Sequence, residues 1–216
     1  MLSLSSWIAH VFDHPVTDPA WYWSLDAPQW NDAPEHIALL IADTLERSGE
    51  LLAPFSDAQL EQGFWYLVSN SCSEYMYSLV DSSVPLATRL RALRSFVPLF
   101  EQVMALRCSP HLSHLDEQPA NPLNGSCYMW WDILPIHGKP EEPERAEFDS
   151  EVLRVLAQIL SIPHDACRES ALHGVSEWQV YYPSATDIVD NFLLCTPSLR
   201  SELVSYAQRA KFGHVQ

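Results

Sequence analysis

The chain has 216 residues and a formal net charge of −16; 47% of its residues are hydrophobic and only 19% are charged. This apolar content excludes an intrinsically disordered chain, and the negative charge excludes a simple nucleic-acid binder, which must neutralise phosphates. Six glycines against 16 prolines disfavour a turn-rich β-sandwich or barrel and favour helices joined by short, stiff connections.

The negative charge is concentrated in the amino-terminal part of the chain. Residues 1–88 hold 12 acids and a single base, Arg47, for a net charge of −11. Residues 89–216 hold 16 acids and 11 bases, for a net charge of −5. An acidic surface attracts a cationic partner over a long range. The alternative is that this charge serves only solubility.

The cysteines and the apolar runs indicate the cellular compartment. The five cysteines are widely spaced and odd in number, which is not typical of a disulfide framework. The first residues, "MLSLSSWIAHVFDHP", lack the basic region of a secretory signal, and no apolar run approaches the roughly 18 residues of a membrane span. We therefore expect a reduced, cytoplasmic protein with mostly buried thiols and no membrane partner.

The first segments along the chain predict an arm followed by a helix. Residues 1–31 carry four tryptophans among prolines and aspartates, which is typical of an irregular arm that packs across helices. Residues 31–50, "NDAPEHIALLIADTLERSGE", predict a helix with Asp32 and Glu35 as its capping box and Gly49 as its stop.

Two further helical segments follow. Residues 55–81 begin with Ser56 and Gln59 in the relation of a capping box, and "SNSCS" in the middle is expected to bend or split the helix. Residues 85–108, "PLATRLRALRSFVPLFEQVMALRC", repeat apolar side chains at steps of three and four, and Pro98 should kink the helix.

The carboxy-terminal part combines irregular segments with short helices. We expect a short helix near residues 126–134 and an acidic, proline-rich surface loop at 135–148. Helical patterns then follow at 149–162, 165–178, 183–195 and 196–210, and no alternating strand is evident. The predicted fold is a single all-α domain of residues 1–216, an irregular stack of helices with a Trp-rich amino-terminal arm.

Residues 165–194 resemble one HEAT-like helical repeat. The resemblance lies in an Arg-x-x-Ala-Leu-x-Gly first helix (Arg168, Ala171, Leu172, Gly174), a turn, and an Ile-x-x-x-Phe-Leu second helix. It implies helix pairs that stack into a superhelix whose concave face binds other proteins. The whole chain also resembles small cytosolic bacterial all-helical proteins, a class that includes toxin-immunity proteins.

A polar stripe lies within that repeat. In helical projection Glu169, His173 and Glu177 share one side of the helix, and the apolar side chains and Gly174 share the other. We expect Gly174 to allow close helix packing and the polar stripe to face water. The alternatives are a metal or acid–base site and a partner-binding face. Candidate partner-binding residues are Glu169, His173, Glu177 and the aromatic pair Trp130 and Trp131.

The best metal candidate is "CSPHLSHLDE", which supplies Cys108, His111 and His114, with Cys127 close by in the sequence. Thiolate and imidazole are the donors that zinc prefers. The spacing matches no zinc motif, so the alternative is a capped connector without metal. A weaker candidate pair, His164 and Cys167, lies in "SIPHDAC".

No nucleophile elbow or phosphate-binding loop is evident, so no catalytic residue is predicted. The sequence favours a non-enzymatic cytoplasmic protein-binding module without a cofactor, whose acidic surface captures a cationic protein, as a toxin-immunity protein or an inhibitor would. The alternative is a zinc-binding protein or a metal-dependent hydrolase that uses the Cys108, His111 and His114 region.

Overall fold

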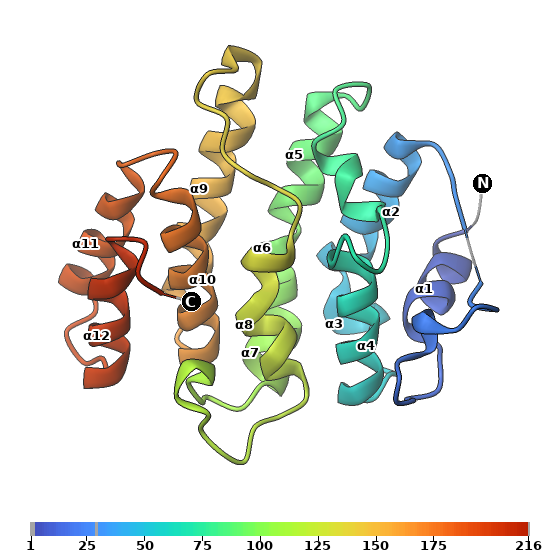
Figure 1. The fold of residues 1–216 in the computed structure, drawn as a ribbon, viewed down its shortest axis with the longest axis horizontal. Helices are drawn as coiled ribbons and strands as arrows, with labels where there is room; N and C mark the ends of the chain where they lie inside the picture. Colours follow the sequence, from blue (N-terminus) through green and yellow to red (C-terminus); the bar gives the residue numbers. More distant parts are fainter. Residues whose placement is uncertain (1–2, 29, 216) are drawn as a thin grey trace. The chain divides into compact units, whose positions relative to one another are not determined.

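We describe the chain from a computed structural model that covers residues 3–28 and 30–215 (Figure 1). The protein is all-helical, with 64% helix and no strand among the described residues, so the predicted fold class is confirmed. In the same residues, no helix combines the length and the apolar character needed to cross a bilayer.

Contacts between Cα atoms divide the chain into two units. The first comprises Met1–Val103 with Ile133–Ile136, and the second comprises Met104–Asp132 with His137–Gln216. Buried apolar side chains occur in both units. The expectation of one domain, and that of a HEAT-like superhelix, remain predictions.

The first unit contains the helices of the amino-terminal half. Its core forms where α2 packs on α5 and on the 3₁₀ helix η2, and where α1 packs on α4. The elements are α1 (Leu4–Phe12), η1 (Trp21–Trp23), α2 (Pro34–Glu46), α3 (Ser48–Leu51), α4 (Asp57–Val68), η2 (Tyr75–Leu79), α5 (Leu86–Arg94) and α6 (Phe96–Leu99).

The Trp-rich amino-terminal segment includes a helix that the sequence analysis did not predict. Helix α1 begins after Ser3, whose hydroxyl accepts a hydrogen bond from the backbone N–H of Ser6 at 3.2 Å. The helix buries Trp7, Ile8, Val11 and Phe12 on one face. The prolines that suggested an irregular segment all lie beyond this short amphipathic helix.

The helix boundaries confirm some of the predicted caps and correct others. The capping box of Ser56 and Gln59 is present at the start of α4. The box predicted at Asp32 and Glu35 is wrong, because Ala33 is the N-cap of α2 and no side chain caps that end. The predicted stop at Gly49 is also wrong, since α2 ends at Glu46 and the glycine lies inside α3.

The long helix predicted for residues 85–108 is broken. Its parts are α5, α6, a π-helical turn over Phe100–Met104, and α7 (Ala105–Arg107). Pro98 lies in α6 just before the π turn. A proline has no N–H to donate and disturbs the preceding turn, so a break near this position is expected.

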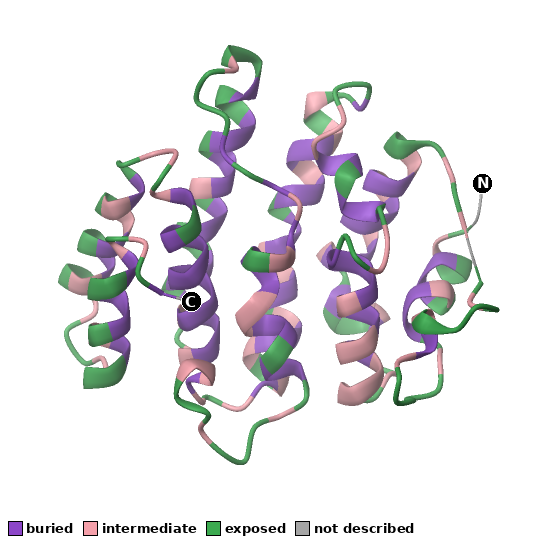
Figure 2. Ribbon diagram, in the orientation of Figure 1, coloured by how far each residue is buried: buried purple, intermediate pink, exposed green. Residues whose placement is uncertain are grey.

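The second unit is arranged around α10, which packs against α9, α11 and α12 (Figure 1). Helix α10 is buried along most of its length (Figure 2). The elements after α7 are η4 (Ser113–Leu115), α8 (Leu123–Ile133), η5 (Pro143–Arg145), α9 (Ala146–Ser161), α10 (Asp165–Trp178), α11 (Ala185–Cys195) and α12 (Ser201–Ala210).

The acidic surface loop predicted at 135–148 is shorter than expected. Helix α9 begins at Ala146, so Phe148 lies within a helix and is buried. Arg145 is buried as well, and its guanidinium donates to the carboxylate of Asp149 at 2.9 Å. The prolines and glutamates obscured this helix start, which a buried ion pair stabilises.

The contact of α1 with α4 depends on a missing side chain. A Cβ on Gly63 would lie 2.3 Å from Cδ1 of Phe12 and 2.9 Å from the carbonyl oxygen of Val11. We expect Gly63→Ala to lower the free energy of unfolding by about 1–3 kcal/mol, as overpacking does. Urea unfolding followed by circular dichroism measures this change.

Gly49→Ala is the matched control. The nearest atoms to its new Cβ belong to the flexible side chain of Gln102, the closest at 3.0 Å, so its effect should stay within about 1 kcal/mol. Equal stabilities for the two variants would show that the approach of α4 to α1 is not tightly packed.

Candidate functional site

The first unit contains a hollow of about 770 Å³. Its wall comes from the residues just before and at the start of α2, the end of α4, the connection that follows α4, and η2. The aromatic side chains that line it are those of Trp30, Tyr66, Tyr75 and Tyr77. Among the described lining residues, the carboxylates of Asp32, Glu74 and Asp81 are the charged groups, and neither lysine nor arginine occurs.

A hydrogen-bond network holds the aromatic part of the wall in place. Nε2 of His10 shares hydrogen bonds with the hydroxyls of Tyr75, at 2.8 Å, and Tyr66, at 3.2 Å. The Tyr75 hydroxyl also donates to the backbone carbonyl of Trp30 at 3.1 Å. Tyr66 and Tyr75 are buried, while Tyr77 is 44% exposed and lies at the rim. The wall is therefore ordered before any ligand arrives.

The aspartates of the hollow are ionised at neutral pH. The hydrogen bond from His36 and that from the backbone N–H of Ala33 lower the pKa of Asp32. Hydrogen bonds from Ser83 lower the pKa of Asp81. Burial raises the pKa of Tyr66 and of Tyr75, so both phenols stay neutral. The negative charge of the wall thus comes from its carboxylates, while the phenols of Tyr66 and Tyr75 are neutral.

In the second unit, the polar stripe of α10 does not face water as predicted. Glu169 is 0% exposed and His173 is 2% exposed, and only Glu177 lies at the surface. Helix α12 and the turn at residues 113–114 cover the side of α10 that the projection assigned to solvent. A projection of one helix holds no information about neighbours on its polar side, and this is why the expectation was wrong.

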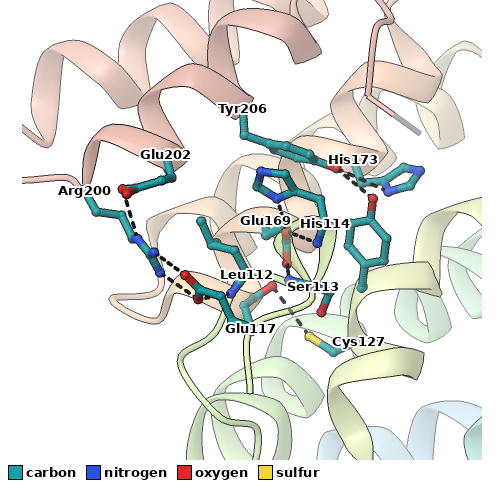
Figure 3. Close-up of polar contacts among 12 residues, drawn as sticks. Leu112, Ser113, His114, Glu117, Cys127, Glu169, His173, Arg200, Glu202 and Tyr206 are labelled. Carbon is teal, nitrogen blue, oxygen red and sulfur yellow. Dashed lines mark hydrogen bonds and ion pairs between the residues drawn. The ribbon is translucent and has the colours of Figure 1, made fainter. Parts of the chain in front are cut away.

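Glu169 is the acceptor that ties the turn at residues 113–114 to α10 (Figure 3). Its carboxylate accepts the backbone N–H groups of Ser113, at 2.7 Å, and His114, at 3.1 Å, together with Nδ1 of the His114 ring at 2.5 Å. The His114 ring packs on the ring of Tyr206, with 4.3 Å between centroids. These donors satisfy carboxyl oxygens that would otherwise be buried without hydrogen bonds, which is very unfavourable in the core.

The two tryptophans predicted to bind a partner lie in the core. Trp130 and Trp131 are buried, so they offer no surface to another protein. Gly174 allows this packing, because a Cβ there would lie 2.5 Å from Leu156 and 2.7 Å from Trp131. The predicted close approach at Gly174 is confirmed.

The structure does not bring the four predicted zinc ligands together. The ring of His114 is bound to Glu169, and Nδ1 of His111 is buried without a hydrogen-bond partner. Cys108 and Cys127 do contact each other, inside the core. Within residues 3–28 and 30–215, a different set of possible metal ligands does come together. One donor atom each of Asp132, His173 and Glu177 lies within 4.8 Å of the other two.

The three buried thiols of Cys108, Cys127 and Cys167 form a chain of contacts that ends at His164. The Cys127 thiol hydrogen-bonds with both Cys108 and Cys167, and these contacts together with burial raise its pKa. The hydrogen bond from Cys127, followed by that from His164, lowers the pKa of Cys167 to about 6. The weaker pair noted in the sequence, His164 and Cys167, is therefore in contact. Cys167 is completely buried, so no substrate reaches its sulfur.

Comparisons with known proteins provide no relative, since no family model, no curated protein and no solved structure matches this chain. A function has to be inferred from the side chains themselves. The sequence analysis missed Asp132 as a neighbour of His173, because some 40 residues separate them and no local pattern links them. No local pattern in the sequence indicated that Tyr75 and Tyr77 line a hollow either.

Removal of the Glu169 carboxylate tests its role in positioning the turn. We expect Glu169→Leu to lower the free energy of unfolding by about 3–5 kcal/mol, because three donors lose their buried acceptor. Glu169→Gln retains one acceptor oxygen and should lower the free energy of unfolding by a smaller amount. Urea unfolding compares them with Gln208→Leu, an exposed position on the neighbouring helix α12, where a change within about 0.5 kcal/mol is expected. A leucine variant as stable as the glutamine variant would contradict this role.

The same connector supplies a pH-dependent contact. The Arg200 guanidinium and the backbone N–H of Leu112 donate to Glu117 and lower its pKa to about 2. Stability from this contact is present above the usual pKa of 4.5 and is lost as the pH falls toward 2. In an NMR titration we expect Arg200→Gln to raise the Glu117 pKa toward 4.5. Arg209→Gln, which removes a different charge, should leave it unchanged; an effect as large as that of Arg200→Gln would contradict the assignment.

Proposed function

We propose that the protein is a non-enzymatic cytoplasmic binding protein whose first unit captures a cationic protein. A lysine or arginine side chain of the partner would enter the hollow, against its aromatic wall. The observation that carries this proposal is the composition of that wall, in which all the charged lining residues that the structure describes are acidic.

The physics of cation recognition supports the proposal. A cation over the face of a Trp or Tyr ring gains about 0.5–2 kcal/mol, depending on how far it is desolvated. Trp30 and Tyr77 supply such faces, and Glu74 supplies an exposed carboxylate beside them. The net charge of −11 over residues 1–88 would speed the encounter through long-range attraction.

The order of the wall also favours binding. The hydrogen bonds from His10 already fix Tyr66 and Tyr75, so little side-chain entropy is lost when a ligand arrives. Burial, followed by the nearby charge of His14, lowers the pKa of His10. The imidazole behind the wall is therefore neutral near pH 7 and does not repel an incoming cation.

The second unit gives less support to a catalytic role. The sulfur of Cys167 is enclosed in the core, and the four residues of the predicted zinc region do not come together in one group. An inhibitor or toxin-immunity protein that binds a basic target fits the acidic hollow. A toxin-immunity role also agrees with the resemblance to small bacterial helical proteins. The five free cysteines suit a reducing cytoplasm.

A lysine-rich peptide labelled with a fluorophore is the probe that tests the hollow. We expect fluorescence anisotropy to detect its binding at low salt, with weaker binding at high salt and none for a glutamate-rich peptide. Glu74→Lys should weaken binding about tenfold or more, because it replaces an attraction with a repulsion. Tyr77→Ala should weaken binding without altering its dependence on salt.

Glu101→Lys is the control, since it makes the same change in charge at an exposed site of the first unit outside the hollow. It should weaken binding much less than Glu74→Lys. Equal losses for the two variants would show that the overall charge attracts the peptide and that the hollow is not its site.

A further inference from the structure

Two carboxylates and one imidazole meet in the second unit, at the end of α8 and along α10. His173 and Glu177 are one turn apart on α10, and Asp132 is the penultimate residue of α8. One donor atom from each lies within 4.8 Å of the other two. We infer that Asp132, His173 and Glu177 form a binding site for a divalent transition-metal ion, and that this ion is zinc.

The donor set suits zinc. Zinc binds imidazole nitrogen and carboxylate oxygen, and a site with three protein ligands leaves one position for water. Calcium and magnesium prefer sites made only of oxygen, so an imidazole disfavours them. Ligands about 2.0–2.1 Å from the ion lie closer together than these donors, and small rotations of the exposed Asp132 and Glu177 side chains would close the difference.

The charges around the site favour a cation. Asp132 and Glu177 make no ion pair and no hydrogen bond within the described part of the chain, although their carboxylates lie close to each other. Two neighbouring negative charges repel each other, and a cation between them converts this repulsion into two attractions. These two carboxylates thus differ from Asp149 and Glu117, which each have an arginine partner.

His173 is held in the orientation that a ligand needs. It is almost completely buried, and its ring meets that of Tyr128 edge-on at 4.9 Å between centroids. Its Nδ1 lies 3.5 Å from the Tyr206 hydroxyl, which is the one hydrogen bond of this ring among the described residues, so Nε2 is left for an ion. A hydrogen-bonded second nitrogen is the usual support of a metal-bound histidine.

The supporting contacts extend further into the core. Tyr206 packs on His114, and the Glu169 carboxylate fixes His114 (Figure 3). Glu169, His114 and Tyr206 are therefore positioning residues, since they set the place of His173 without a donor atom at the site. This support for His173 explains why a series of polar contacts would run from Glu169 in the core toward the two surface acids of the site.

A zinc titration of the chelator-treated full chain tests the site. We expect calorimetry to show one zinc ion per chain. Asp132→Asn and Glu177→Gln should each weaken its affinity about tenfold or more, and the double variant should abolish binding. Both residues are exposed, so the variants should fold, as circular dichroism will show. Asp187→Asn and Cys195→Ser, at exposed positions elsewhere in this unit, are the controls and should bind zinc normally.

Cobalt identifies the ligands directly, because thiolates give an intense charge-transfer band that oxygen and nitrogen donors lack. We expect cobalt bound to the chain to show no such band. A thiolate band would assign the ion to Cys108, Cys127 or Cys167 and overturn the inference, as would an unchanged zinc affinity in the double variant or no zinc binding at all. Peptide capture by the first unit does not depend on these residues and should persist in every case.

Discussion

A carboxyl group buried in a protein core needs hydrogen-bond donors around it, and Glu169 is the residue on which this constraint acts. Its donors come from the backbone and ring of residues 113 and 114, far away in the sequence. The irregular connector is thereby fixed on α10. The ring of His114 in turn supports Tyr206, which lies against His173. The order of the polar side of this unit thus follows from the hydrogen bonds of one buried carboxyl group.

The two units use their charges differently. In the second unit, several acids have an arginine or lysine partner, as Asp149 has in Arg145 and Glu117 has in Arg200. In the first unit only one base occurs before residue 89, so most of its acids have no arginine or lysine available nearby in sequence. The excess of negative charge is therefore a local property, and it coincides with a hollow whose wall is aromatic.

Local signals allowed the helical fold class, the cap at Ser56 and the close packing at Gly174 to be predicted, because each depends on neighbours in sequence or on a single helix face. The burial of Glu169 depends on residues more than 50 positions away, and no periodicity encodes it. The same holds for the approach of Asp132 to His173 and for the aromatic wall of the hollow. Sites assembled from distant segments are what the sequence alone could not provide.

The burial of Cys167 makes the reaction rate of its thiol a measure of how often the core of the second unit opens. Hydrogen bonds with Cys127 and His164 lower the pKa of this thiol, which favours the reactive thiolate, yet its sulfur is enclosed by the fold. Its modification must therefore wait for the surrounding helices to separate. Cys195, on the exposed surface, reacts without that delay. The ratio of the two rates would report how often this core opens to solvent under native conditions.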